Sequence, residues 1–360
     1  MRDCVTARGF PLVRAGLLAG LIVLPACDRI LNYTEQQHIE RARESQRHGK
    51  FYAAEIELRN ALAKNVNSAD ARWLRGQILV ELGRGVEAEE ELKRARDLGM
   101  SAEALKVPLG NALLFQKQYR RVMDEIKVAP ESTQANAARI LEIRGRAQLG
   151  LGSYKVGCAL FDEAKQKDPS QVPAYWGQAL CDLGMGKMAD ARGRLQEALK
   201  IEPKNGRTWT LLGDLERGAN RPEEATKAYG TALEYLPEDL DARLGRAAVR
   251  LMQRKWKDAE ADINYVVGHS RGHYLAVHLR GVLAFGLGRY VDAKNLFQVA
   301  LRSNTDYAPT YLWLGFTEYE LQNYETSASY LGQFLARQPN ATRVHALLAL
   351  VQTRRGGGPE

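Results

Sequence analysis

The sequence predicts an all-α protein, a right-handed α-solenoid of about nine helix–turn–helix repeats that ends in one capping helix. Three observations support this fold class. A 34-residue period runs from Glu35 to about residue 341, small residues recur at two fixed positions of the period, and a large apolar residue recurs at a third. A fixed period of this length is typical of solenoids, because each repeat buries its apolar face against its neighbours.

The register of the period follows from its small and large positions. Repeats begin at Glu35, Ala69, Glu103, Ala138, Val172, Gly206, Leu240, Tyr274 and Ala308, with one inserted residue in the third. The eighth position is small throughout (Ala42, Gly76, Gly110, Gly145, Ala179, Gly213, Ala247, Gly281, Gly315), and the twentieth is small except at Val122. The twenty-fourth is always large and apolar (Leu58, Leu92, Ile126, Phe161, Leu195, Tyr229, Ile263, Phe297, Leu331). Small positions let two helices approach closely, and the large residue fills the space between hairpins.

Turn residues separate the helices of each repeat. Gly83, Gly152, Gly186 and Gly288 occupy the fifteenth position, where a turn between two helices needs a permissive backbone. Pro169, Pro203, Pro237 and Pro339 close four repeats, because proline cannot continue the helical hydrogen bonds. Each repeat is therefore expected to be a helical hairpin.

The repeat resembles the tetratricopeptide repeat, for which a 34-residue helix–turn–helix unit is characteristic. The sixth repeat carries the motif most fully, with Trp209, Leu212, Gly213, Ala225, Tyr229, Ala232 and Pro237. The resemblance covers nine repeats over residues 35–341. Residues 342–360 are expected to form a solvated capping helix and a disordered tail.

The N-terminus has the pattern of a secretory signal peptide over residues 1–26. Arg2, Arg8 and Arg14 precede an uncharged run at residues 15–24, which is too short to span a bilayer as a permanent helix. No later stretch of the sequence is apolar enough to cross a membrane. We therefore expect a translocated chain.

Leu24, Ala26 and Cys27 resemble the lipobox of bacterial lipoproteins, although Pro25 departs from it. The resemblance implies that Cys27 is lipidated and that residues 27–34 tether the repeats to a membrane. The alternative is soluble export after ordinary signal cleavage. Asp28 resembles an inner-membrane retention signal, so a periplasm-facing lipoprotein of the inner membrane is expected in the bacterial envelope, with the outer membrane as the alternative.

Composition excludes several classes of protein. A hydrophobic share of 45% excludes a disordered chain, and four cysteines exclude a disulfide-dense scaffold. The formal net charge of +8 falls to +6 without residues 1–26, which hold three arginines and one aspartate. The most acidic repeat, the sixth, adjoins the most basic, the seventh. Without a continuous basic stripe, we expect no nucleic-acid partner.

The first helices are expected to line a concave groove that binds a protein or peptide segment, as the resemblance implies for positions 2, 5, 9, 12 and 13. The partner-binding candidates are Trp73, Asn111, Phe115, Arg139, Arg146, Trp176, His278, Phe316 and Tyr319. The same positions also hold Val107, Leu114, Leu180, Leu183, Arg207, Arg217, Leu244, Leu251, Phe285 and Leu312. In the alternative interpretation, many of these side chains belong to the core between successive helices. Some relatives use Lys and Asn at positions 5 and 9 to grip a carboxylate, but only Asn111 fits that pattern.

Three other features invite chemical interpretations. His269, His273 and His278 lack a completing cysteine or carboxylate, so we expect no metal site, and we expect the first two in an exposed turn. Cys158 and Cys181 fall in neighbouring repeats and could form a disulfide, but we expect two buried thiols. The acidic run at residues 87–91 is expected to form a solvated helix face.

The expected function is a non-enzymatic scaffold for protein–protein interaction, since no phosphate-binding loop, nucleophile elbow or zinc-protease motif is present. No catalytic residue, cofactor or small-molecule substrate is expected. Residues 51–126 resemble tetratricopeptide lipoproteins of PEP-CTERM/exosortase systems, in the runs AEIELRNAL at 54–62, LG at 82–83, AEEEL at 88–92, ALL at 112–114 and QY at 118–119. That resemblance implies exopolysaccharide production or export, or surface-protein sorting. A pilus or outer-membrane assembly lipoprotein is the alternative.

Overall fold

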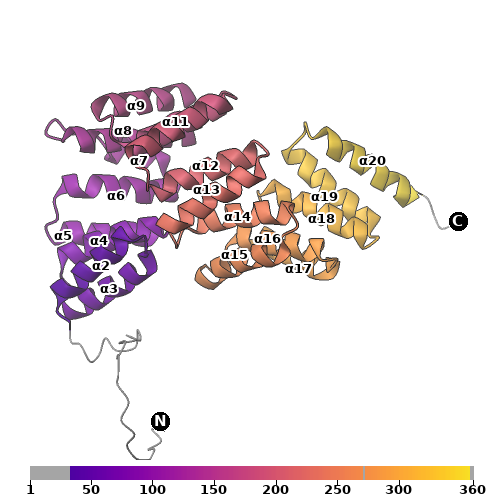
Figure 1. Ribbon diagram of the computed structural model, residues 1–360, viewed down its shortest axis with the longest axis horizontal. Helices are drawn as coiled ribbons and strands as arrows, with labels where there is room; N and C mark the ends of the chain where they lie inside the picture. Colours follow the sequence, from indigo (N-terminus) through magenta and orange to yellow (C-terminus); the bar gives the residue numbers. More distant parts are fainter. Residues whose placement is uncertain (1–32, 271, 357–360) are drawn as a thin grey trace, which may run out of the picture.

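The computed structural model describes residues 33–270 and 272–356 (Figure 1). The predicted signal peptide, Cys27, Asp28, most of the tether and the last four residues lie outside this range. Within it the chain forms helices and no strand. None of these described helices combines the length and apolar character that a bilayer crossing requires.

The helices form nine antiparallel hairpins followed by one helix, which confirms the all-α solenoid (Figure 1). The hairpins are α2 (Glu35–Arg47) with α3 (Phe51–Lys64), α4 (Ala69–Glu81) with α5 (Gly85–Asp97), α6 (Ala102–Phe115) with α7 (Tyr119–Glu125), α8 (Gln134–Gly150) with α9 (Tyr154–Lys167), α10 (Val172–Gly184) with α11 (Met188–Ile201), α12 (Gly206–Gly218) with α13 (Pro222–Tyr235), α14 (Leu240–Met252) with α15 (Trp256–His269), α16 (Tyr274–Gly286) with α17 (Tyr290–Ser303), and α18 (Ala308–Glu320) with α19 (Tyr324–Arg337). The cap, α20 (Thr342–Gly356), packs on α19.

The core confirms the predicted roles of the eighth and twenty-fourth positions. All nine large residues at the twenty-fourth position are buried. A Cβ added at Gly213 would lie 2.7 Å from the ring of Tyr229, and one added at Gly281 would lie 2.6 Å from the ring of Phe297. Because no real Cβ atom tolerates such a contact, the small residue is what admits the large one.

The inserted residue makes the third repeat irregular. Seven of the nine first helices begin at the predicted residue, but α6 begins one residue early and α8 begins four residues early. Helix α7 has only 7 residues and ends at Glu125. Residue 129 precedes Pro130, which disfavours the helical region for it, so the chain runs without helix from 126 to 133.

The solenoid curves so that its beginning meets its middle. Figure 1 shows α2 to α5 beside the ends of α13 and α14, while α16 to α20 extend away from them. The backbone N–H of Tyr52 donates to the carboxylate of Glu238 at 2.8 Å, which confirms that these distant segments touch. The concave surfaces of the early and middle repeats therefore face one another.

The predicted solvated face at residues 87–91 is wrong for two of its four glutamates. Glu89 and Glu91 are buried. Arg72 and Arg75 on the neighbouring helix each donate to Glu91 at 2.9 Å. A carboxylate can be buried in this way because charged hydrogen bonds replace the water that it loses.

The same arrangement recurs in other hairpins. Basic side chains at the fourth and seventh positions of a repeat meet a buried carboxylate at its twenty-third position. The three sets are His38, Arg41 and Glu57; Arg72, Arg75 and Glu91; and Arg243, Arg246 and Asp262. Each set joins the two helices of one hairpin.

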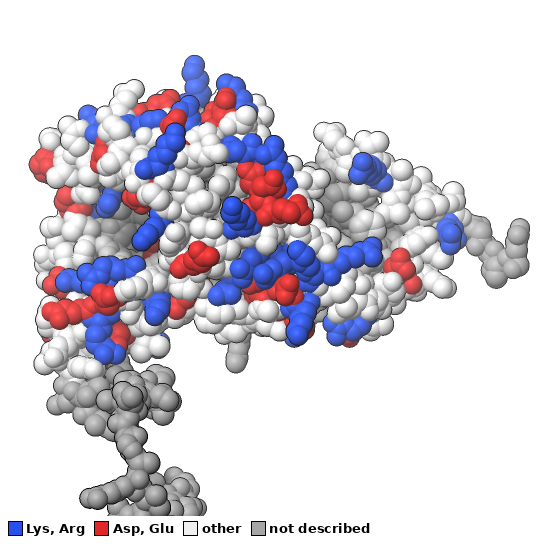
Figure 2. Space-filling model, viewed as in Figure 1, with Lys and Arg blue, Asp and Glu red and all other residues white. Residues whose placement is uncertain are grey.

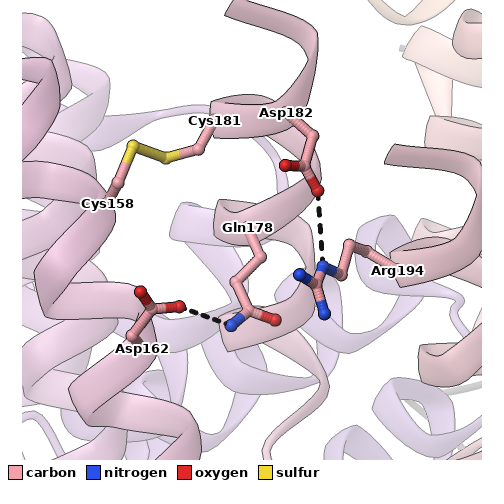
Figure 3. The surroundings of a disulfide bond; sticks show 6 residues. All are labelled: Cys158, Asp162, Gln178, Cys181, Asp182 and Arg194. Carbon is pink, nitrogen blue, oxygen red and sulfur yellow. Dashed lines mark hydrogen bonds and ion pairs between the residues drawn. A yellow bond between two sulfur atoms is a disulfide. The ribbon is translucent and has the colours of Figure 1, made fainter. Parts of the chain in front are cut away.

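Cys158 and Cys181 form a disulfide, which corrects the expectation of two buried thiols (Figure 3). Cys158 lies on α9 and Cys181 on α10, and their Cα atoms are 5.9 Å apart. This separation falls within the range that a disulfide spans. The bond joins the second helix of the fourth repeat to the first helix of the fifth.

Charges of both signs are interspersed on the face drawn in Figure 2. Acidic and basic side chains adjoin one another over the middle repeats, and ion pairs such as that between Arg192 and Glu216 join neighbouring hairpins. This face therefore offers no continuous basic track to a nucleic-acid backbone.

Candidate functional site

A pocket of about 220 Å³ lies on the concave surface of the sixth to eighth repeats. The first helices of three consecutive repeats, α12, α14 and α16, supply its walls, and Tyr307, just before α18, closes one side. The lining residues are Arg207, Thr210, Leu211, Asp214 and Arg217 of α12; Asp241, Leu244, Gly245 and Ala248 of α14; Leu275 and Leu279 of α16; and Tyr307, which precedes α18. The pocket exceeds the roughly 150 Å³ of a cavity that holds benzene. It can therefore accept one large side chain.

The pocket has an apolar floor and a charged rim, which follows from helix geometry. Leu211, Leu244 and Leu279 lie at similar positions of successive repeats, so their side chains form a row. Helices α12 and α14 are held at their starts by side-chain caps. Asn205 accepts from the N–H of Thr208, and Asp239 accepts from that of residue 242.

Two arginines and two aspartates at the rim are paired. Arg207 donates to Asp241 at 3.0 Å, and Arg217 donates to Asp214 at 3.2 Å. The hydroxyl of Tyr229, a core residue, accepts from Arg217 and donates to Asp214 at 2.7 Å. Burial and the nearby Asp214 carboxylate raise the pKa of Tyr229, so the hydroxyl keeps its proton. The rim thus presents ordered donors and acceptors around an apolar floor.

Carboxyl groups near the pocket hold their protons more tightly than usual. Glu81, at the end of α4, is exposed, but the repeats around the concave space limit its hydration and raise its pKa, and the Asp239 carboxylate raises it further. Arg207 and Arg146 oppose this rise. Helices α4, α8 and α12 and the N-cap residue of α14 therefore bring charged groups into one concave space.

The two predicted groove tryptophans connect adjacent repeats. The indole N–H of Trp73 donates to the backbone carbonyl of Ala104 at 3.1 Å, and that of Trp176 donates to Thr208 at 2.9 Å. Pro108 has no N–H to donate to Ala104, so Trp73 occupies an acceptor that the helix leaves open. Both tryptophans are half-buried.

The polar groove candidates of the third and fourth repeats also contact one another. Arg146 donates to the side-chain oxygen of Asn111 at 3.3 Å. Arg139 is exposed and donates to Gln171 at 3.1 Å. Phe115 is 48% exposed, so its ring is available to a partner.

The three C-terminal candidates differ in exposure. His278 is buried and its Nδ1 lies 2.9 Å from the hydroxyl of Thr310 in the next repeat, so it stabilises a repeat interface. Burial lowers the pKa of His278 to about 4. Phe316 and Tyr319 are half-buried on α18. The ring of Phe316 packs against Trp313, with centroids 5.8 Å apart.

The other positions of the predicted groove divide between surface and core. Leu180 and Leu183 are 45% and 37% exposed. Leu114 and Leu251 are buried, as the alternative of a core role requires for them. Leu244 is also buried but forms part of the pocket floor.

The pocket includes two acidic residues that were not among the predicted groove residues. Arg207, Arg217 and Leu244 were named among the groove residues. Asp214 and Asp241 were not named, although they lie at the ninth and second positions of their repeats, which are groove positions. Their pairing depends on helices 34 residues apart, and a covarying pair at that spacing is the signal that would have found Arg207 and Asp241.

Glu142 was also missed. It is buried at the fifth position of the fourth repeat, 3.7 Å from Arg146. Burial raises its pKa to about 7, and Arg146 only partly offsets that rise. Its repeat position is a groove position, so the register alone could have nominated it.

The histidine cluster does not gather at one point. His269 is exposed and stacks on Tyr265, with centroids 4.1 Å apart, whereas His273 is half-buried. Within residues 33–270 and 272–356, no three His, Cys, Asp or Glu side chains are placed to hold a metal ion.

A wider hollow of about 420 Å³ lies between α9 and α10, near the disulfide, and is more open than the pocket. Asp162 accepts from Gln178 at 2.7 Å there (Figure 3), and Lys165 pairs with Glu197 at 3.1 Å. Five residues line this hollow, and three of them, Asp162, Gln178 and Lys165, already have partners. The pocket of the sixth to eighth repeats is therefore the better candidate.

Comparison with known proteins supports the fold at two levels. Tetratricopeptide-repeat family models match residues 39–103, 210–272 and 284–351, together more than half of the chain. A solved structure of PilW, described as a widely conserved type IV pilus biogenesis factor, is 20% identical with a TM-score of 0.50, covering 59% of this chain and 98% of its own. PilF of Pseudomonas aeruginosa is 19% identical with a TM-score of 0.50, covering 61% of this chain and 99% of its own.

No curated protein matches the sequence. The similarity to solved structures therefore establishes the fold, and the family models identify the repeat. Together with the nine observed hairpins, these matches show that the chain is a tetratricopeptide-repeat protein.

Proposed function

We propose that the protein is a non-enzymatic scaffold that binds an extended segment of a partner protein on its concave surface. The pocket of the sixth to eighth repeats carries this proposal. Its apolar floor takes one large apolar or aromatic side chain of the partner, while Arg207, Arg217, Asp214 and Asp241 bond to the partner's backbone or polar side chains.

A pocket-filling substitution tests this binding mode. A peptide selected by phage display against the full chain serves as the probe, and its affinity is measured by fluorescence anisotropy. Ala248→Leu should weaken binding at least tenfold, because Ala248 is half-buried at the pocket wall. Gln77→Leu places the same side chain at the same position of the second repeat and should leave affinity unchanged. Equal affinities for all three proteins would refute the pocket as the anchor.

We also propose that the chain is exported and held in the bacterial envelope by lipid on Cys27. The signal pattern and lipobox-like residues support this, and the disulfide suits an oxidising compartment. Labelled palmitate should appear on the wild-type protein and not on Cys27→Ser. Asp28 favours inner-membrane retention, and Asp28→Ser should then shift the protein to the outer-membrane fraction.

An envelope complex for exopolysaccharide production, export or surface-protein sorting is the first candidate system, on the resemblance of residues 51–126. The second is pilus or outer-membrane assembly, and the likeness in fold to PilW and PilF supports it. Crosslinking in intact membranes distinguishes the two. Glycosyltransferases or polysaccharide exporters would support the first, whereas secretins or pilins would support the second.

A further inference from the structure

The turn of the first hairpin is seated on the junction between the sixth and seventh repeats. Gly49, between α2 and α3, lies against Leu236, which ends α13. A Cβ added at Gly49 would lie 2.8 Å from the Leu236 side chain and 3.0 Å from the carbonyl oxygen of Tyr235. The two segments are in contact without room for another atom.

The same junction caps the helix that follows the turn. Lys50, the N-cap of α3, makes no side-chain hydrogen bond to the helix. The N–H of Tyr52 has no acceptor within its own helix, and the carboxylate of Glu238 accepts it from 186 residues away. A carboxylate also suits the positive end of the helix dipole. The ring of Tyr52 lies against His269, with centroids 4.8 Å apart.

This contact is continuous with the pocket. Residues 235–239 lead directly into α14, which supplies Asp241 and Leu244 to the pocket. Across the concave space, Glu81 of the second repeat interacts electrostatically with Arg207 at the pocket rim and with Asp239 at the start of α14. When the first hairpin is seated, the second repeat therefore faces the pocket.

We propose that the first hairpin is an intramolecular clasp, seated on residues 235–239, that restricts access to the pocket until it is released. This regulation rests on the function proposed above. A partner segment longer than the pocket needs the space that the second repeat occupies, so it binds the released form more tightly. Binding of the partner and release of the first hairpin are then coupled, because the partner shifts the equilibrium toward the released form.

The size of the contact suits a reversible device. Among the described residues its contacts include one hydrogen bond, one ring contact and one close turn, whereas each hairpin is held to the next along its helices. Contacts with so little buried surface open at a small cost compared with the unfolding of a repeat.

Two pairs of variants isolate the clasp in the full chain. Gly49→Ala and Glu238→Ala remove its packing and its hydrogen bond. Gly152→Ala is the control for the first, since Gly152 also has a positive φ, +79° against +64°, with nothing within 4 Å of its added Cβ. Asp306→Ala is the control for the second, because Asp306 occupies the corresponding position of the eighth repeat.

Hydrogen exchange at the Tyr52 amide measures the clasp without any ligand. Exchange should rise at least tenfold in Gly49→Ala and Glu238→Ala and stay unchanged in both controls. The radius of gyration from small-angle X-ray scattering should rise in the same two variants. Equal exchange in all five proteins would overturn the clasp.

The regulation is then measured as the affinity for the phage-selected peptide, provided that Ala248→Leu weakens the binding of this peptide at least tenfold. The two released variants should bind this peptide at least threefold more tightly than wild type, and the controls should not. Faster exchange at Tyr52 with unchanged or weaker affinity would overturn the regulation. If no peptide depends on Ala248, the proposed function fails and the regulation fails with it, while protection of Tyr52 reports separately on the clasp.

Discussion

Removing the disulfide should loosen the junction between the fourth and fifth repeats. The bond closes a loop with a sequence separation of 23 between Cys158 and Cys181. Loop-closure entropy for a loop of this length corresponds to about 3 kcal/mol at 25 °C. In a solenoid each repeat packs mainly on its neighbours, so the loss should fall on α9 and α10 and spare distant hairpins such as α16 and α17.

Native-state hydrogen exchange on the oxidised and reduced protein measures this loss. A local change of about 3 kcal/mol predicts more than a hundredfold faster exchange in α9 and α10. The double variant Cys158→Ala with Cys181→Ala should already exchange at the faster rate and should not respond to reductant. Free thiols at both positions in protein isolated without reductant, or equal exchange in both redox states, would refute the reasoning.

Three further perturbations test the core and the groove. Gly245→Ala should destabilise the protein by about 1–3 kcal/mol in urea denaturation, because the added Cβ collides with a buried tyrosine ring. Gly230→Ala is the control and should be neutral or stabilising, because nothing lies within 4 Å of its added Cβ. The pKa of Glu142 is about 7 in the folded protein against 4.5 ordinarily, so between these two pH values the folded state binds more protons than the unfolded state. The free energy of unfolding should therefore fall as pH rises from 4.5 to 7, by roughly 3 kcal/mol. Glu142→Gln should remove this decline, and parallel pH profiles for both proteins would contradict the prediction. Trp73→Phe should cost about 1 kcal/mol in the same denaturation assay, because the carbonyl of Ala104 loses its donor; an unchanged midpoint would show that water replaces the indole.

The periodic part of the fold could be predicted because its rules are local and repeated. A small eighth position and a large twenty-fourth position must meet in every hairpin, as Gly213 and Tyr229 do, so nine repeats report the same constraint. The third repeat departs from the register because one inserted residue and Pro130 shorten α7. The repeat pattern locates the irregular repeat, but it does not predict the conformation of the chain there.

Burial of charge could not be predicted from one helix at a time. The run at residues 87–91 reads as solvated because Lys93 and Arg94 on its own helix pair with Glu89 and Glu91 as they would on an exposed face. Glu91 is buried with bonds from Arg72 and Arg75, which reach it from the preceding helix. The disulfide has the same origin, since the pairing of Cys158 with Cys181 depends on how two hairpins stack.

The closure of the solenoid lies still further from the sequence pattern. Glu238 meets Tyr52 across 186 residues, a distance set by the summed rotation of five repeats. Small differences in each hairpin angle add along such an array. The repeat register carries no information about that sum, so the clasp appears only in the folded chain.

The pocket shows how a constant core can create a variable site. Eight repeats place Leu, Ile or Phe at the twenty-fourth position, and the sixth places Tyr229 there. Its ring fills the same buried space, but its hydroxyl reaches the concave surface and bonds to Asp214 and Arg217. One added oxygen on a core side chain therefore orders the charged rim of the groove above it. Groove chemistry in this protein therefore depends on the core as well as on the exposed positions. Asp214 lies at a groove position, the ninth of its repeat, but its bond to the core residue Tyr229 appears only in the folded chain.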